Sequence, residues 1–180
     1  MHHGRNREAV ELETRRAVLV RLAALPLLGG LGACAAPGPP PPVITPTVIT
    51  IRADANVNPN QDGTPSPTVI KLYDLKAQTN FMSASFFELL DSDVTRLGPE
   101  MLSKQEVEIL PGTTRDVDHQ ITGDVKFLGV IAGFRNINSA QWRAIVEVVP
   151  GKTNYFLVQL TSLAVSVELN ATRGKGWFGQ

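Results

Sequence analysis

The sequence is poor in the side chains from which catalytic and metal sites are most often built. Its 180 residues include one cysteine and three histidines, and two of these histidines stand at the extreme N-terminus. A Ser-His-Asp triad would therefore depend on His119, and no Gly-x-Ser-x-Gly nucleophile motif accompanies that residue. A zinc site needs several His, Cys or carboxylate ligands in one place. We expect no enzymatic activity, no cofactor and no bound metal ion.

An excess of charge of one sign is also lacking, and so are long hydrophobic runs. Lys and Arg number 17, Asp and Glu number 17, and no block of five basic residues occurs. This argues against nucleic acid as a partner. The apolar run at residues 22–31 is too short to cross a bilayer core of roughly 30 Å as a helix. Because five arginines precede it, this run has the form of a secretory signal.

The apolar run ends in the letters LGAC, which place small residues directly before the only cysteine, Cys34. This tetrapeptide resembles the lipobox of bacterial lipoproteins, whose cysteine receives a diacylglyceryl group before the signal is cut off and the new amine is acylated. The resemblance implies a signal peptide over residues 1–33 and lipidation of Cys34. An ordinary signal peptide with a chance cysteine is the alternative. Ala35 stands where Asp would resemble an inner-membrane retention signal, which implies sorting to the outer membrane.

A proline-rich tether is expected after the lipid, over residues 34–47. Proline fixes φ and has no N–H to donate, so the four consecutive prolines at 39–42 favour an extended polyproline II spacer. At roughly 3.1 Å per residue, such a spacer would hold the domain as far as about 40 Å from the lipid. A slack, disordered tail is the alternative. The expected folded domain is residues 48–170, followed by a C-terminal tail at 171–180.

Short strands with polar turns account for most of the expected domain. Apolar and polar residues alternate over 49–55 and again over 116–121, where His119 lies on the apolar side and is expected to be a hydrogen-bonded structural residue. Residues 127–134 are almost continuously apolar, which is typical of a central strand covered on both faces. Further strands are expected at 69–75, 142–149, 155–160 and 163–169. Their spacing favours a mainly β, two-sheet antiparallel sandwich.

One segment, SASFFELLDS, departs from the strand pattern. Ser85 and Glu88 have the spacing of a helix capping box, and Phe86, Leu89 and Leu90 fall on one helical face. Residues 97–102 can add another helical turn. We therefore expect a small helical insertion between the second and third predicted strands. In the strand region that follows, Trp142 is expected to pack in the core.

The segment NVNPNQDGTPSP, residues 56–67, raises the question of a metal site. Its alternating Asn and Asp residues followed by Gly63 match the start of an EF-hand-like calcium loop. Val69 occupies the position where that loop requires a bidentate Glu, so we reject calcium binding. The prolines and Asp-Gly instead predict a stiff turn. Such a loop loses little entropy on binding a partner, although a purely structural loop is equally compatible with these residues.

The stretch NPNQDGTPSP is followed in order by VIKLYDL, FFELLDSD, LPG, FLGVIAGFRN and WR. Together they resemble the outer-membrane lipoprotein of the type VI secretion system, the TssJ family. The resemblance implies a transthyretin-like β-sandwich that faces the periplasm from an outer-membrane lipid anchor. It also implies binding to the periplasmic C-terminal domain of the inner-membrane protein TssM through the loop between the first two strands. The candidate partner-binding residues are Asn58, Asn60, Gln61, Asp62, Gly63 and Thr64.

Two other classes of protein share parts of this pattern. A transthyretin-like hydrolase would have the same sandwich, but the His and Arg set of that family and its Tyr-Arg-Gly-Ser ending are absent from this chain, which ends Phe178-Gly179-Gln180. A periplasm-facing lipoprotein with a β-sandwich ligand-binding or adhesive domain is the alternative function. A large aromatic platform would favour it, whereas aromatic residues make up only 6% of the chain.

Overall fold

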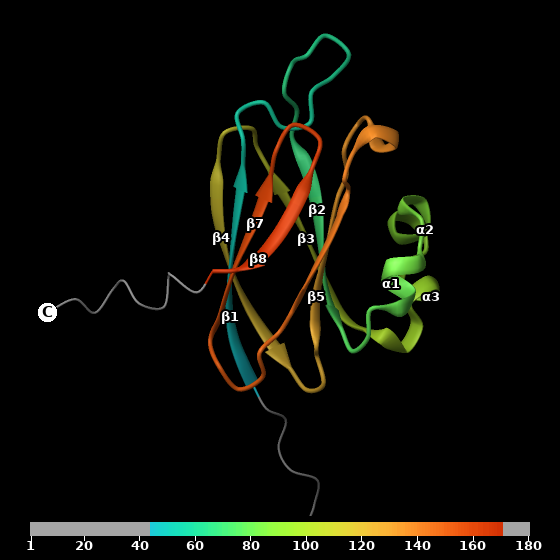
Figure 1. The fold of residues 1–180 in the computed structure, drawn as a ribbon, viewed down its shortest axis with the longest axis vertical. Helices are drawn as coiled ribbons and strands as arrows, with labels where there is room; N and C mark the ends of the chain where they lie inside the picture. The colour runs from blue at the N-terminus through green and yellow to red at the C-terminus, as the bar shows by residue number, and fades with distance from the viewer. Residues whose placement is uncertain (1–43, 171–180) are drawn as a thin grey trace, which may run out of the picture. The chain divides into compact units, whose positions relative to one another are not determined.

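The computed structural model describes residues 44–170, which form a sandwich of two four-stranded sheets (Figure 1). The first sheet has the strand order β4-β1-β7-β8 and the second the order β3-β2-β5-β6. The strands are β1 (Ile44–Ala53), β2 (Thr68–Leu75), β3 (Met101–Ile109), β4 (Thr114–Thr122), β5 (Phe127–Ala132), β6 (Arg143–Glu147), β7 (Asn154–Leu160) and β8 (Val165–Leu169). The expected two-sheet sandwich is confirmed. All strand pairs are antiparallel except β1 with β7, which run parallel.

Alternating side chains of both sheets meet between them and form the main core. From β1, Ile49 and Ile51 are fully buried, and Ile70 and Leu72 of β2 face them from the other sheet. Strand β5 lies between β2 and β6, and both of its faces are covered, since Leu128 and Val130 belong to the core between the sheets and Ile131 to the cluster under the helices. The expectation of a central strand there is therefore confirmed.

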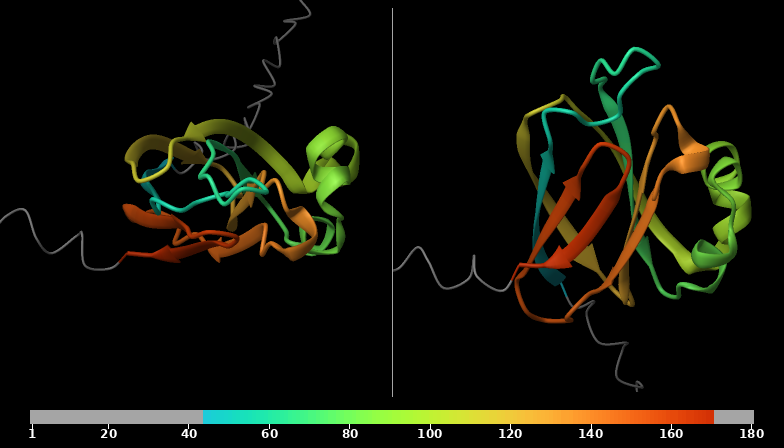
Figure 2. Two further views of the ribbon diagram at one scale, coloured as in Figure 1. Left: turned by 90° about the horizontal axis from the view of Figure 1, so that it is seen from above. Right: turned by 45° about the horizontal axis from the view of Figure 1, so that its top comes forward.

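A layer of three short helices covers the outer face of the second sheet (Figures 1 and 2). These helices are α1 (Thr79–Ser83), α2 (Phe86–Asp91) and α3 (Asp93–Leu97), followed by a 3₁₀ turn, η1 (Gly98–Glu100). The expected capping box at the start of α2 is present, since Ser85 Oγ accepts from Glu88 N and Glu88 Oε2 accepts from Ser85 N at 2.7 Å. Buried apolar side chains join the layer to the sheet, namely Tyr73, Leu75, Phe81, Phe86, Leu89, Leu97 and Ile131.

Two cationic side chains tie the helical layer to the sheet by bonding backbone carbonyls at helix ends, which lack partners within the helix. Lys71 Nζ donates to Leu90 O at 2.9 Å. Arg143 Nη1 donates to Phe81 O at 2.8 Å and Ala84 O at 2.9 Å, and burial lowers the pKa of Arg143. None of the helices within residues 44–170 is long and apolar enough to cross a membrane.

Three differences from the sequence-based expectations concern element boundaries. Strand β3 was not predicted, and residues 101–102, expected to add a helical turn, are its beginning. Val107 and Ile109 are the only buried residues of β3, so the apolar alternation is confined to the last part of this strand. Strand β1 begins at Ile44, whereas the predicted alternation began at residue 49 and the predicted domain at 48, and its first residues pair with the end of β4. The helical insertion contains three helices where one, with one further turn, was expected.

Candidate partner-binding site

The loop between β1 and β2, residues 54–67, projects from one end of the sandwich, and β1 begins at the opposite end (Figure 1). Its tip is closed by its own hydrogen bonds. Asn60 N donates to Thr64 O at 2.8 Å and Gly63 N donates to Asn60 O at 3.0 Å. The side-chain oxygen of Asn60 accepts from Asp62 N at 3.0 Å and from Thr64 N at 2.8 Å. Gly63 has a φ of 78°, a conformation that glycine adopts without strain. The predicted stiff turn is therefore present.

Asn58 has a different position from the other candidate residues. Its side chain is inside the loop, because the residue is only 2% exposed. The Nδ2 group donates to Pro67 O at 3.0 Å, and Oδ1 accepts from Arg135 N at 2.7 Å. Its φ of 50° falls in the left-handed region, which Asn tolerates better than most residues. Asn58 is thus placed to shape the loop, while the neighbouring Val57 is fully buried in the core.

The remaining candidate residues form the accessible tip. Gln61, Asp62, Gly63 and Thr64 are exposed, and Asn60 is half-buried. Of these residues, Asp62 alone carries a formal charge. The tip is therefore a rigid and mainly neutral surface that can be desolvated at low cost.

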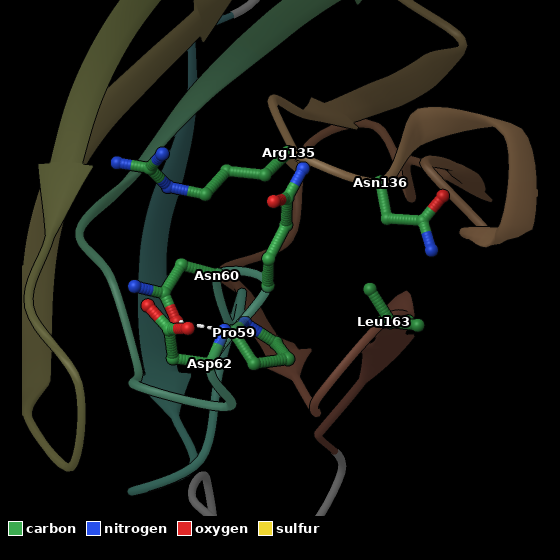
Figure 3. Close-up of a pocket in the computed structure, with 7 residues that line it drawn as sticks. Pro59, Asn60, Asp62, Arg135, Asn136 and Leu163 are labelled. Carbon is green, nitrogen blue, oxygen red and sulfur yellow. Dashed lines mark hydrogen bonds between the residues drawn. The ribbon is translucent and has the colours of Figure 1, made fainter.

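The tip borders a groove of about 680 Å³ (Figure 3). Residues from two other connections complete the lining: Arg135 and Asn136 from the β5–β6 connection, and Leu163 from the β7–β8 turn. Sequence reasoning missed all three residues. They are far from the loop in the sequence, and Arg135 and Asn136 follow a predicted strand in a polar segment whose local pattern indicates no site. Pairing of the strands brings these connections to the same end of the sandwich (Figure 1).

The geometry of the loop does not resemble a calcium site. The Asn60 side-chain oxygen already accepts two backbone N–H groups, and Val69 is an exposed residue of β2. Over residues 44–170 no group of three or more His, Cys, Asp or Glu side chains is placed to hold a metal ion.

His119 has the structural role that was expected of it. Its Nε2 atom lies 2.8 Å from Asp74 Oδ1, and this contact joins β4 of one sheet to β2 of the other. Ser103 Oγ also donates to the Asp74 carboxylate. In a catalytic triad the serine hydroxyl bonds the histidine, whereas here it bonds the aspartate. The cluster is therefore a bridge between the sheets.

Trp142, which was expected in the core, is partly buried and packs against the core. The ring packs against the apolar clusters on both sides of the second sheet and contacts Phe86 edge-on, with a ring-centroid distance of 5.4 Å. Arg143 stacks on the Trp142 ring with 4.7 Å between the guanidinium carbon and the ring centroid. The expected lipidation site Cys34 and the tail at 171–180 lie outside the described residues.

Comparison with known proteins identifies the family. The family model T6SS-SciN, described as type VI secretion lipoprotein, VasD, EvfM, TssJ, matches residues 45–163. The crystal structure of the T6SS lipoprotein TssJ1 from Pseudomonas aeruginosa is 28% identical, with a TM-score of 0.68 over 74% of this chain and 99% of that one. A search of curated proteins gives no match.

Two further solved structures have the same fold. Serratia marcescens Lip, a membrane bound component of the type VI secretion system, is 21% identical with a TM-score of 0.63, covering 69% of this chain and 96% of that one. A chain in the structure of the T6SS protein TssM C-terminal domain from EAEC is 26% identical with a TM-score of 0.58, covering 68% of this chain and 99% of that one. Since the family model spans well over half of the sequence, this chain belongs to the TssJ family of type VI secretion lipoproteins, non-enzymatic structural components of a secretion apparatus.

Proposed function

We propose that this chain is the outer-membrane lipoprotein subunit of a type VI secretion membrane complex. In this proposal a lipid on Cys34 anchors the chain, and the β1–β2 loop binds the periplasmic C-terminal domain of the TssM-type inner-membrane protein. Family membership supports the assignment to the secretion system. The similarity to a chain in the structure named for a TssM C-terminal domain supports the choice of partner.

The observation that carries the proposal is the position of the rigid tip relative to the start of the domain. Ile44, where β1 begins, is at one end of the sandwich, and the β1–β2 loop is at the other (Figure 1). The ten residues of β1 span about 33 Å at roughly 3.3 Å per residue. A chain anchored through its N-terminal segment therefore presents the loop away from the anchor, toward a partner that rises from the inner membrane.

The length of the tether limits how far the domain can move from the lipid. Because β1 begins at Ile44, the tether comprises residues 35–43, which is shorter than the segment expected from sequence. Nine fully extended residues reach at most about 32 Å. The loop tip can thus extend deep into the periplasm only through the combined length of the tether and the sandwich.

The test of the proposal is binding of the full mature protein, purified in detergent, to the periplasmic domain of the cognate TssM-type protein. Simultaneous replacement of Gln61, Asp62 and Thr64 should weaken binding by at least about tenfold, since these side chains supply the exposed tip. The melting temperature should stay unchanged because no buried side chain is altered. The proposal fails if the wild-type chain does not bind or if the triple variant binds equally well.

The anchor is tested separately in cells. Mass spectrometry of the N-terminal peptide should identify a lipidated Cys34, and membrane fractionation should place the protein in the outer membrane. Cys34→Ser should release the chain from the membrane and stop secretion. Deletion of the loop tip should also stop secretion while leaving the lipoprotein in the outer membrane. An unmodified Cys34 would contradict the anchoring half of the proposal only.

A further inference from the structure

Three connections at the loop end of the sandwich are joined into one unit by backbone hydrogen bonds. Asn58 N, in the β1–β2 loop, donates to Ser162 O in the β7–β8 turn at 2.9 Å. Gln141 N, in the β5–β6 connection, donates to Leu163 O in the same turn at 2.9 Å. The bond from Arg135 N to Asn58 Oδ1 at 2.7 Å links the β5–β6 connection back to the loop. The three connections therefore hold one another in place.

Asn58 takes part in two of these three bonds. It is buried, and its backbone N–H, side-chain oxygen and side-chain nitrogen each bond a different segment. Because one short side chain carries two of these contacts, removing it would separate the loop from Arg135 without touching the exposed tip. The backbone of Arg135 is thus fixed relative to the tip even though its side chain is exposed.

The Arg135 side chain adds a positive charge to the groove, whereas the loop tip carries only the negative charge of Asp62. Among the groove residues, Arg135 and Asp62 are the two with a formal charge. Figure 3 shows their side chains directed to the same side of the loop. Over residues 44–170 no carboxylate lies within ion-pairing distance of Arg135, and Asp62 pairs with no cation. Both charges are therefore available to a partner.

We propose that Arg135 is a specificity-determining residue of the partner-binding surface, where it receives a carboxylate of the TssM-type protein, and that Asn58 is its positioning residue. This inference rests on the proposed function. A guanidinium offers several donors in a planar fork that matches a carboxylate. The side-chain NH2 group of Asn60 borders the same groove, on the side to which the Arg135 side chain is directed, and can donate to a remaining carboxylate lone pair. The matched partner thus carries an acidic side chain that enters between the loop tip and the β5–β6 connection.

The first experiment measures binding of Arg135 variants of the full mature protein to the cognate TssM-type periplasmic domain. Arg135→Ala should raise Kd about tenfold, chiefly through slower association, and should reduce the dependence of Kd on salt. Arg135→Glu should weaken binding further because it opposes the partner carboxylate. The matched control is Lys126→Glu, which makes the same charge change at an exposed position on the opposite end of β5, and it should stay within about twofold of wild type.

The second experiment tests the role of Asn58. Asn58→Gly permits the positive φ but removes both side-chain bonds, so the Arg135 amide should exchange its hydrogen faster and Kd should rise about tenfold. Combined with Arg135→Ala, the losses should be less than additive, because the arginine is the group that Asn58 positions. If the glycine variant does not fold, Asn58→Asp keeps an acceptor for Arg135 N but loses the donor to Pro67 O, so the Arg135 amide should stay better protected than the amides of the loop next to Pro67. Full additivity in the double variant would overturn the positioning role.

The outcomes separate this inference from the proposed function. If the wild-type chain binds and Arg135→Glu binds within about twofold of it, the inference about Arg135 is wrong while the proposed function stands. If the wild-type chain does not bind, both are wrong. A loss of binding in Arg135→Glu that a charge-reversing substitution of one acidic residue on the partner restores would establish the ion pair directly.

Discussion

The buried carboxylate of Asp93 connects the helical layer to the second sheet, and its replacement by a neutral side chain should cause a large loss of stability. Asp93 is the first residue of α3, and its side chain is only 6% exposed. Lys104 Nζ donates to both of its oxygens at 2.9 Å, and Lys71 Nζ lies 3.5 Å from Oδ2. The Tyr73 hydroxyl lies 3.3 Å from the same oxygen. Two sheet strands and one helix therefore meet at this carboxylate.

The pKa of Asp93 is lowered in this cluster, and the pKa of Tyr73 is raised. Burial acts to raise the pKa of Asp93, but the hydrogen bond from Lys104 and the charges of Lys71 and Lys104 outweigh it, so the pKa is lowered. Burial, followed by the charge of Asp93, raises the pKa of Tyr73 well above its usual range, so the phenol stays protonated. A carboxyl whose pKa is lower in the folded state than in the unfolded chain, about 3.9, stabilises the fold above that pH. This contribution is lost as the pH falls through the folded-state pKa.

Asp93→Asn should lower the free energy of unfolding by about 2–4 kcal/mol at pH 7. Breaking a buried ion pair typically costs about 3–5 kcal/mol. The free-energy cost here is expected near the lower end of that range, because the Lys104 side chain is 37% exposed and its ammonium group can be hydrated when the carboxylate is removed. Lys71 keeps its bond to Leu90 O and a contact of 3.4 Å with Glu106. For a domain of this size, Tm falls by about 3–4 °C for each kcal/mol of lost stability, so the expected fall is about 6–16 °C.

Chemical denaturation followed by circular dichroism, at pH 7 and at several pH values down to 3, measures this effect. The difference between wild type and Asp93→Asn should begin to narrow below about pH 4, where the carboxyl of the unfolded chain takes up a proton, and should close as the pH falls through the lowered folded-state pKa of Asp93. Asp91→Asn, an exposed position on α2, is the matched control and should change stability by less than about 0.5 kcal/mol. A difference that stayed constant from pH 7 to 3, or no difference at pH 7, would refute the assignment of the charge cluster.

Three further perturbations have expected outcomes that thermal unfolding can measure. Gly129→Ala should lower stability by about 1–3 kcal/mol, because its Cβ would lie 2.9 Å from Phe81 of the helical layer; an unchanged Tm would contradict this packing. A chain that begins at residue 48 should be less stable, by at least about 2 kcal/mol, than one that begins at 44. It lacks the buried Thr45 and the pairing of 44–47 with β4, and equal melting would argue against that pairing. Millimolar calcium should leave Tm unchanged since Asn60 already bonds within the loop, whereas a saturable shift would reinstate the metal site.

Local sequence patterns were sufficient to predict the central elements of the fold. The alternation in β1 and the continuous apolar run in β5 reflect how many faces of each strand are buried, and that information is present in neighbouring residues. The capping box at Ser85 is equally local, since both partners are within one helical turn. Strand β3 was missed because only its last part, with Val107 and Ile109 buried between exposed glutamates, has the apolar alternation of a strand, and the rest is fixed by its hydrogen bonds to β2.

The candidate site likewise has one part that local sequence predicts and one part that depends on the tertiary structure. Turn-forming residues within one short segment determine a stiff loop between β1 and β2, so the sequence alone predicted the exposed tip from Asn60 to Thr64. Only the tertiary structure decided that Asn58 is buried and bonds the backbone of Arg135. The position of the β5–β6 connection beside the tip was also decided by the tertiary structure alone. The physical reason is that a local turn depends on the conformational preferences of adjacent residues, whereas a surface made of several loops exists only after strands distant in sequence have paired.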